Sequence, residues 1–151
     1  MNSYLALVDH DETGYGALVP ELETVMANAD TLEELLSLVS EGIALHLLEE
    51  TVPSLPRLRT LADVPPGMLE GFKEPQAHLV APAPLNPVSL EVERAFEQSG
   101  LSQSELARRL GTSRAAVARL MDPFYWGHSF PMLRRVAEVL GAKLHFEIRA
   151  A

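Results

Sequence analysis

Residues 102–120 restrict the fold more than any other stretch of this chain, because their spacing is that of a helix-turn-helix. Gly111 stands where two short helices would meet, and glycine adopts the left-handed conformation of such a turn at the least cost. Ala107 is small where the second helix would cross the first. Ser102, followed by Glu105, has the pattern of a capping box. Four apolar residues are spaced to close the angle between the two helices: Leu106, Leu110, Val117 and Leu120.

The second helix of this unit is expected to face DNA. Arginine binds guanine O6 and N7 in the major groove, and short side chains let a helix approach the bases. Gln103, Ser104 and Arg108 are better placed to hold phosphates. The expected DNA-binding residues are Gln103, Ser104, Arg108, Thr112, Ser113, Arg114, Ala115, Ala118 and Arg119. The alternative is a helical hairpin in a bundle that has no role in nucleic-acid binding.

The C-terminal segment of the chain is the predicted dimer interface. One such unit reads only a few base pairs, so we expect a homodimer or a tetramer on double-stranded operator DNA with an inverted repeat. Residues 143–149 alternate strictly, which predicts a β-strand with Leu144, Phe146 and Ile148 on one face. Pairing of this strand with its mate would form the dimer interface. The alternative is a strand that only caps its own domain.

Charge divides the 151-residue chain in two. Residues 1–86 hold 3 basic and 14 acidic residues, whereas residues 87–151 hold 9 basic and 7 acidic ones, giving net charges of −11 and +2. The split indicates two modules, of which the first suits a basic partner; the alternative is that the acidity serves only solubility. The lack of cysteine excludes disulfides and thiolate metal sites. We expect no membrane span, no signal peptide and no cofactor.

The first 50 residues predict a small sheet followed by a helix. Strands are expected at residues 4–8, 15–19 and 24–29, with residues 9–14 as the first turn. A helix is expected from about residue 31 to residue 50, with a stripe of apolar residues toward the core. Leu38 and Leu45 form a second apolar row on it. That row is either part of a wider buried face or a seam for protein binding or self-association.

Residues 51–87 contain eight prolines, so regular structure there must be short. A short helix at 66–72 and a strand at 77–81 are expected. From Ser89 the pattern turns helical, with helices at 89–98, 102–110, 112–121 and 132–140. We therefore expect an N-terminal domain at 1–82, with a proline-rich segment at 51–76, a linker at 83–88 and a C-terminal domain at 89–151.

Several motifs together resemble the HicB antitoxin family. The N-terminal ones are the runs at residues 4–8, 11–15, 19–22 and 30–34, followed by the long amphipathic helix. The C-terminal ones are the run at residues 101–111, the run at 119–123, and Leu133, Ala137, Leu140 and Gly141. The resemblance implies an α+β protein. Its N-terminal domain would be a partial RNase H-like, HicB-like ββ-β-α-β unit, and its C-terminal domain an all-α helix-turn-helix unit with a terminal β-strand.

The resemblance also implies partners. The N-terminal domain would bind and neutralise a small basic ribonuclease toxin, HicA, and the helix-turn-helix would repress the promoter of the pair. The expected cell compartment is the bacterial cytoplasm, with association to the nucleoid when the operator is bound. Residues expected to contact the toxin, chosen for charge and family analogy, are Asp9, Asp11, Glu12, Tyr15, Glu21, Glu23, Glu33, Glu34 and Glu41.

Other functions have less support in the sequence. A one-component repressor that senses a small molecule would need a pocket, and we find no convergent polar cluster to build one. An RNase H-type nuclease would need carboxylates from separate strands around two metals, whereas residues 9–12 are adjacent in one predicted turn. His46 and His78 have no evident base-and-nucleophile partner. The aromatic residues 124–126 are expected in a core or dimer contact rather than in an exposed binding loop. We therefore predict a protein without enzymatic activity.

Overall fold

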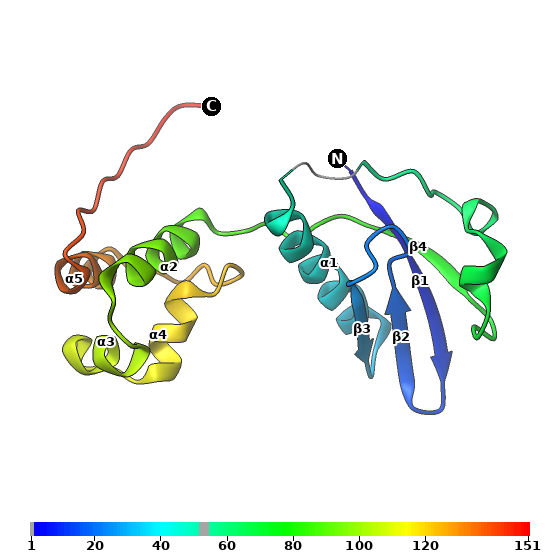
Figure 1. The fold of residues 1–151 in the computed structure, drawn as a ribbon, viewed down its shortest axis with the longest axis horizontal. Helices are drawn as coiled ribbons and strands as arrows, with labels where there is room; N and C mark the ends of the chain where they lie inside the picture. Colours follow the sequence, from blue (N-terminus) through cyan, green and yellow to red (C-terminus); the bar gives the residue numbers. More distant parts are fainter. Residues whose placement is uncertain (1, 52–54) are drawn as a thin grey trace. The chain divides into compact units, whose positions relative to one another are not determined.

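The computed structural model describes residues 2–51 and 55–151, so residues 52–54 of the predicted connector lie outside the described residues. The chain forms two compact units, residues 1–84 and 85–151 (Figure 1). The first contains a four-stranded antiparallel sheet and a long helix, and the second contains helices. The predicted α+β class is therefore confirmed.

The sheet of the first unit has the strand order β3-β2-β1-β4. Its strands are β1 (Tyr4–Asp11), β2 (Gly14–Leu18), β3 (Met26–Ala29) and β4 (Gln76–Val80), which confirms the order ββ-β-α-β. The prediction that residues 9–14 form the first turn is wrong. The ladder between β1 and β2 continues to the pair Asp11 and Gly14, which leaves only Glu12 and Thr13 between the strands.

Helix α1 (Leu32–Glu49) covers one face of the sheet. The hydroxyl oxygen of Thr31 caps it by accepting a hydrogen bond from the Glu34 amide at 3.2 Å. The predicted stripe is buried where it meets the sheet, because Leu35, Val39 and Ile43 pack in one cluster with Tyr4, Ala6 and Val8 of β1. These six side chains belong to the main core of the first unit, which also includes residues of β2, β4 and the loop before β3.

The opposite face of the sheet is covered by the proline-rich connector. The 3₁₀ helices η1 (Leu61–Asp63) and η2 (Pro66–Leu69) lie in this segment, so the predicted helix at 66–72 is a shorter 3₁₀ turn. Val64 packs with Leu5 and Leu7, both completely buried. The connector returns from the end of α1 toward the β1–β2 turn, so β4 enters the sheet antiparallel to β1 (Figure 1). Strand β1 is thus sandwiched between two layers.

The second unit consists of α2 (Pro87–Ser99), α3 (Gln103–Leu110), α4 (Arg114–Met121) and α5 (Phe130–Leu140). Helix α2 begins before the predicted Ser89, because the Asn86 side chain accepts a hydrogen bond from the Val88 amide and proline suits the first helical position. The first two residues of α2 thus lie within the segment 83–88 predicted as a linker. Helix α4 begins after the predicted Thr112, because Ser113 is its N-cap.

The terminal β-strand expected at residues 143–149 is absent from the structure, in which every residue of the second unit is described. Helix α5 ends at Gly141, and the remaining residues run on without pairing to a strand (Figure 1). The physical reason is that residues 85–151 contain no other strand whose edge could satisfy the backbone groups. Within the described residues, no helix is long and apolar enough to cross a membrane.

Candidate functional surfaces

Helices α3 and α4 and the turn between them have the predicted geometry. Gly111 adopts the left-handed conformation with φ 68°, and its amide and that of Thr112 bond back to the end of α3. Ala107 is buried at the crossing. The four predicted apolar residues are all buried in the core of the second unit: Leu106, Leu110, Val117 and Leu120. The turn and its closing residues are thus confirmed by the structure.

The outer face of α4 exposes the side chains that sequence analysis assigned to DNA. Ser113, Arg114, Ala115, Ala118 and Arg119 are all exposed, whereas Val117 and Leu120 of the same helix face the core. Ser104 and Arg108 of α3 are also exposed, while Gln103 and Thr112 are half-buried. The two arginines of α4 lie five positions apart and have no carboxylate partner among the described residues.

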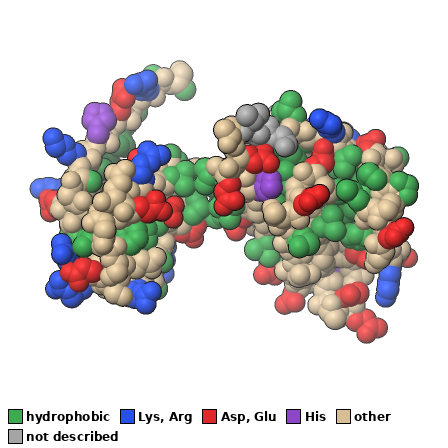
Figure 2. Space-filling view, viewed as in Figure 1, with side chains coloured by type: hydrophobic (Ala, Val, Ile, Leu, Met, Phe, Trp, Pro, Cys, Tyr) green, Lys and Arg blue, Asp and Glu red, His purple; other side chains and the backbone are tan. Residues whose placement is uncertain are grey.

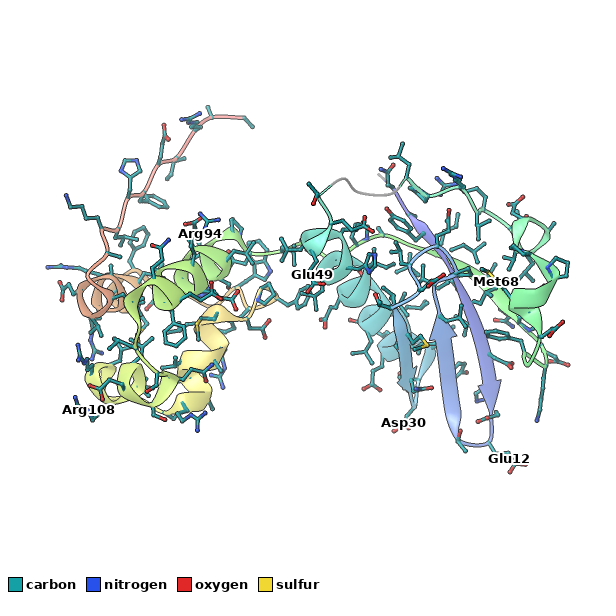
Figure 3. The ribbon with its side chains drawn as sticks, in the orientation of Figure 1. Glu12, Asp30, Glu49, Met68, Arg94 and Arg108 are labelled. Atoms are coloured by element: carbon teal, nitrogen blue, oxygen red, sulfur yellow. The ribbon has the colours of Figure 1, made fainter. Side chains whose placement is uncertain are left out.

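The Glu105 carboxylate pairs with two arginines of α3 and does not complete the predicted capping box. Ser102 accepts a hydrogen bond from the Glu105 amide at 3.1 Å, but the Glu105 carboxylate turns to two arginines of its own helix. It accepts from Arg108 at 2.6 and 3.0 Å and from Arg109 at 3.0 Å. These guanidinium groups lower the pKa of Glu105 to about 2. Arg108, which points outward from α3 (Figure 3), therefore already donates two hydrogen bonds to Glu105.

We expect Glu105→Gln to strengthen DNA binding. The substitution removes one negative charge and frees Arg108 for a phosphate, so the slope of log K against log salt should steepen by about one. Fluorescence anisotropy across a salt series measures this slope. Glu138→Gln is the matched control, because Glu138 also pairs with an arginine at i,i+4 but lies on α5. An equal change in both variants would contradict a specific role for α3.

Among the aromatic residues 124–126, Tyr125 is packed against its neighbours and Trp126 is exposed. Tyr125 is half-buried and contacts the His128 ring, with 5.0 Å between centroids. Trp126 is 60% exposed. Asn86 and Ser89, which are buried, bond to the Tyr125 carbonyl at 2.8 and 3.5 Å. The loop is therefore anchored to α2 at Tyr125 while its next residue stays open to solvent.

The residues expected at a dimer interface are exposed in the single chain. Leu144, Phe146 and Ile148 are 45%, 60% and 83% exposed, and the Phe146 ring makes an edge contact with Phe130 at 4.8 Å between centroids. Beside them lies an apolar groove of about 610 Å³ that α2, α5 and the tail line together. The second unit thus carries an apolar surface that its own side chains only partly cover.

Two of the carboxylates expected to bind a basic partner hold the connector instead. Asp9 accepts hydrogen bonds from the amides of Lys73 at 3.0 Å and Glu74 at 3.5 Å, and the first of these is the main reason that the pKa of Asp9 is lowered. Glu21 accepts from the amides of Arg57 at 2.6 Å and Leu58 at 3.2 Å. Both carboxylates therefore have a structural role, which sequence reasoning missed because their partners lie 36 or more positions away.

The structure corrects the expectation that no polar cluster converges in the N-terminal half. A hollow of about 350 Å³ lies at the turn end of the sheet, where Asp9, Asp11, Tyr15, Asn28 and Asp30 line it. The Asp11 carboxylate is occupied by the Thr13 amide and hydroxyl, and Tyr15 stacks on His10 at 4.1 Å. Among the described residues, no group of three or more potential ligands is arranged to hold a metal ion.

His46 also has partners that the sequence did not reveal. Its Nδ1 lies 2.7 Å from the Thr24 hydroxyl and its Nε2 lies 2.9 Å from the Glu50 carboxylate. The chain of three groups links the loop before β3 to the end of α1. His78 of β4 has a buried Nε2 without a hydrogen-bond partner among the described residues. Neither histidine lines the hollow at the turn end of the sheet.

The outer face of α1 combines exposed leucines with carboxylates. Glu34, Leu38, Glu41, Leu45 and Leu48 recur at spacings of four and three, which places them on one ridge of the helix. Leu38 and Leu45 are each 41% exposed, so the second apolar row is not part of a wider buried face. Glu34 is exposed on the ridge, and Glu33 is exposed next to it. Of the remaining expected contacts, Glu12 lies at the tip of the β1–β2 turn (Figure 3) and Glu23 in the loop before β3.

The charge split follows the two units. The first carries a net charge of −11 and the second +2, because residues 85 and 86 are uncharged. In Figure 2 acidic side chains spread over the visible face of the first unit, and lysine and arginine gather on the second. Each unit therefore presents a surface with its own electrostatic character.

Comparison with known proteins identifies one relative that matches almost the whole chain. The chain is 33% identical over 147 residues to antitoxin HicB of Pseudomonas fluorescens (strain Pf0-1), which covers 97% of this chain and 94% of that protein. No protein-family model matches the chain. An acidic α+β unit followed by a helical unit, matched over almost its full length by an antitoxin, defines the class as that of the antitoxins. Within this class, the chain belongs to the HicB family.

Proposed function

We propose that the chain neutralises a small basic, mRNA-cleaving ribonuclease toxin of the HicA type and represses its own operon by binding a palindromic operator. The observation that carries the proposal is the match to an antitoxin over 97% of the chain, which includes both units. The net charge of −11 on the first unit supports a basic partner. In this proposal the protein acts in the bacterial cytoplasm by binding and catalyses no reaction.

The toxin is proposed to dock on the α1 ridge, defined by Glu34, Leu38, Glu41, Leu45 and Leu48. Its exposed leucines supply apolar contact, and Glu34 and Glu41 form no ion pair with any described residue. A second copy would place carboxylate against carboxylate on this ridge, which disfavours self-association. A basic partner can pack against the exposed leucines and also form ion pairs with the two carboxylates. By contrast, Asp9 and Glu21 are already engaged with the connector.

Reversing two charges on the ridge should weaken toxin binding. We expect Glu34→Lys with Glu41→Lys to slow association about 10-fold at low salt, because rim charges steer encounter. The probe is a purified HicA-type toxin, with association followed by stopped-flow fluorescence. Glu70→Lys with Glu74→Lys changes the net charge equally, at two exposed residues that lie outside the ridge and outside the other expected toxin contacts. Equal slowing in both pairs would show that net charge alone steers the toxin.

Operator binding is proposed for α3, its turn and α4. The support is the left-handed turn at Gly111 together with the exposure of Arg114 and Arg119 on one helix. An inverted repeat requires two such units, and the tail at residues 143–149 is proposed to join them. In a dimer the tail of one copy would provide the strand edge that the other lacks, with Leu144, Phe146 and Ile148 buried together.

We expect Phe146→Asp to shift the chain toward monomer. A buried aromatic at the centre of an interface contributes about 2 kcal/mol or more to dimer stability. The dissociation constant of the dimer should therefore rise about 30-fold. Sedimentation equilibrium measures the constant. His145→Asp is the control, because residue 145 alternates to the opposite, polar face of the tail. If the wild-type chain is already monomeric, or if both variants dissociate equally, the tail is not the dimer contact.

A further inference from the structure

The loop between α4 and α5, residues 122–129, holds an aromatic ring against an arginine of the proposed recognition helix. The guanidinium carbon of Arg119 lies 6.0 Å from the centre of the Tyr125 ring, which is within the range of a cation–π contact. Arg119 is otherwise exposed. The aromatic run that the proposed DNA-binding unit leaves unexplained therefore touches that unit at one of its two outward arginines.

The ring of Tyr125 is held firmly in this place. Its hydroxyl donates to the Gly127 carbonyl at 3.1 Å, and its ring packs against the His128 ring with 5.0 Å between centroids. The backbone of Gly127 lies so close that a Cβ there would be 2.5 Å from the Tyr125 hydroxyl oxygen. Any side chain at residue 127 would therefore push the ring away. Glycine at this position is needed for space, and not for an unusual backbone angle.

The loop itself is fixed to the core of the second unit. The backbone amide of Asn86 donates to the Pro123 carbonyl at 2.7 Å, and its side-chain Nδ2 donates to the Tyr125 carbonyl at 2.8 Å. His128 Nε2 lies 2.7 Å from the Leu120 carbonyl at the end of α4. These bonds tie the loop to α2 and α4 at once, so the ring keeps its position relative to Arg119.

We propose that Tyr125 is a positioning residue that orients the Arg119 guanidinium for operator binding. A long arginine side chain loses conformational freedom when it binds, and a ring that holds it beforehand reduces that loss. Specificity for the operator then depends on a residue outside the recognition helix. The inference rests on the proposed DNA-binding function, and the experiment below separates the failure of one from the failure of the other.

The test uses the full chain and a duplex that carries the region upstream of its own reading frame, with an unrelated duplex as competitor. Tyr125→Leu removes the ring and should weaken specific binding about 2- to 5-fold, the range expected of an exposed cation–π contact. Tyr125→Phe keeps the ring and should bind nearly as the wild type does. Gly127→Ala keeps every functional group but displaces the Tyr125 ring, so it should weaken specific binding as much as Tyr125→Leu does. If Tyr125→Leu does not fold, Gly127→Ala takes its place in the test.

A double-mutant cycle distinguishes positioning from a merely structural role. In an Arg119→Ala background, Tyr125→Leu should have no further effect on DNA affinity, because the ring acts through the arginine. An equal loss in both backgrounds, or no loss in the wild-type background, overturns the inference while leaving operator binding intact. If Arg119→Ala itself leaves specific binding unchanged, the proposed role of Arg119 fails as well. Thermal unfolding of each variant verifies that the fold is retained.

Discussion

Replacing Arg114 and Arg119 together by alanine should abolish sequence-specific operator binding while the chain stays folded. Both side chains are exposed on α4, so their removal leaves no cavity in the core. A bidentate contact from arginine to guanine contributes about 1–3 kcal/mol of discrimination, so the loss of two such contacts should remove about 2–6 kcal/mol. Competition anisotropy with operator and unrelated duplexes measures the specificity ratio.

Arg94→Ala with Arg134→Ala is the matched control for this experiment. These arginines are 65% and 79% exposed on α2 and α5 and each pairs with a glutamate of its own helix. The control removes the same charge and should weaken binding to all sequences slightly, with the specificity ratio unchanged. If the control lowers the ratio as much as the α4 pair does, α4 is not the recognition helix.

Leu7→Ala should destabilise the first unit by about 2–5 kcal/mol, because the change leaves a cavity in a completely buried site. Leu7 points away from α1 and packs under the connector with Val64. The loss therefore tests whether the proline-rich segment is a true layer of the fold. Urea unfolding, followed by circular dichroism of the full chain, gives the free energy of unfolding.

Leu79→Ala provides the comparison for the connector layer. Leu79 lies on the edge strand β4 and is 52% exposed, so its truncation should cost less than about 1 kcal/mol. Protection of the amides of Leu58 and Lys73 from hydrogen exchange should fall in Leu7→Ala, because their bonds to Glu21 and Asp9 hold the connector on the sheet. Equal costs for the two variants would contradict a packed connector.

Features that depend on neighbours in the chain could be predicted from residue order. Thr31 and Gly141 mark the ends of helices, and Gly111 marks the turn between α3 and α4, because capping and a positive φ are local requirements. The order of strands and the apolar stripe of α1 follow from periodicities of two and 3.6 residues. The difference in charge between the units needs only counting. Each of these signals lies within a few residues or in composition.

Contacts between distant residues were decided by the tertiary structure alone. An unbroken apolar run from Tyr4 to Val8 is typical of a strand buried on both faces, yet nothing local identifies the connector as its second cover. Asp9 and Glu21 look like free surface charge until the amides of Lys73 and Arg57 meet them. The terminal segment alternates as a strand does, but a strand needs an edge, and pairing is not a property of one segment.

The same distinction applies to the proposed recognition helix. Residue order determined that Arg114 and Arg119 face outward, because helical periodicity assigns the opposite side to Val117 and Leu120. Only the folded chain showed that Tyr125 lies under Arg119 and that Glu105 already holds Arg108. A helix specifies the direction of its side chains by its own geometry, whereas the neighbours that each side chain meets depend on how the separate elements pack.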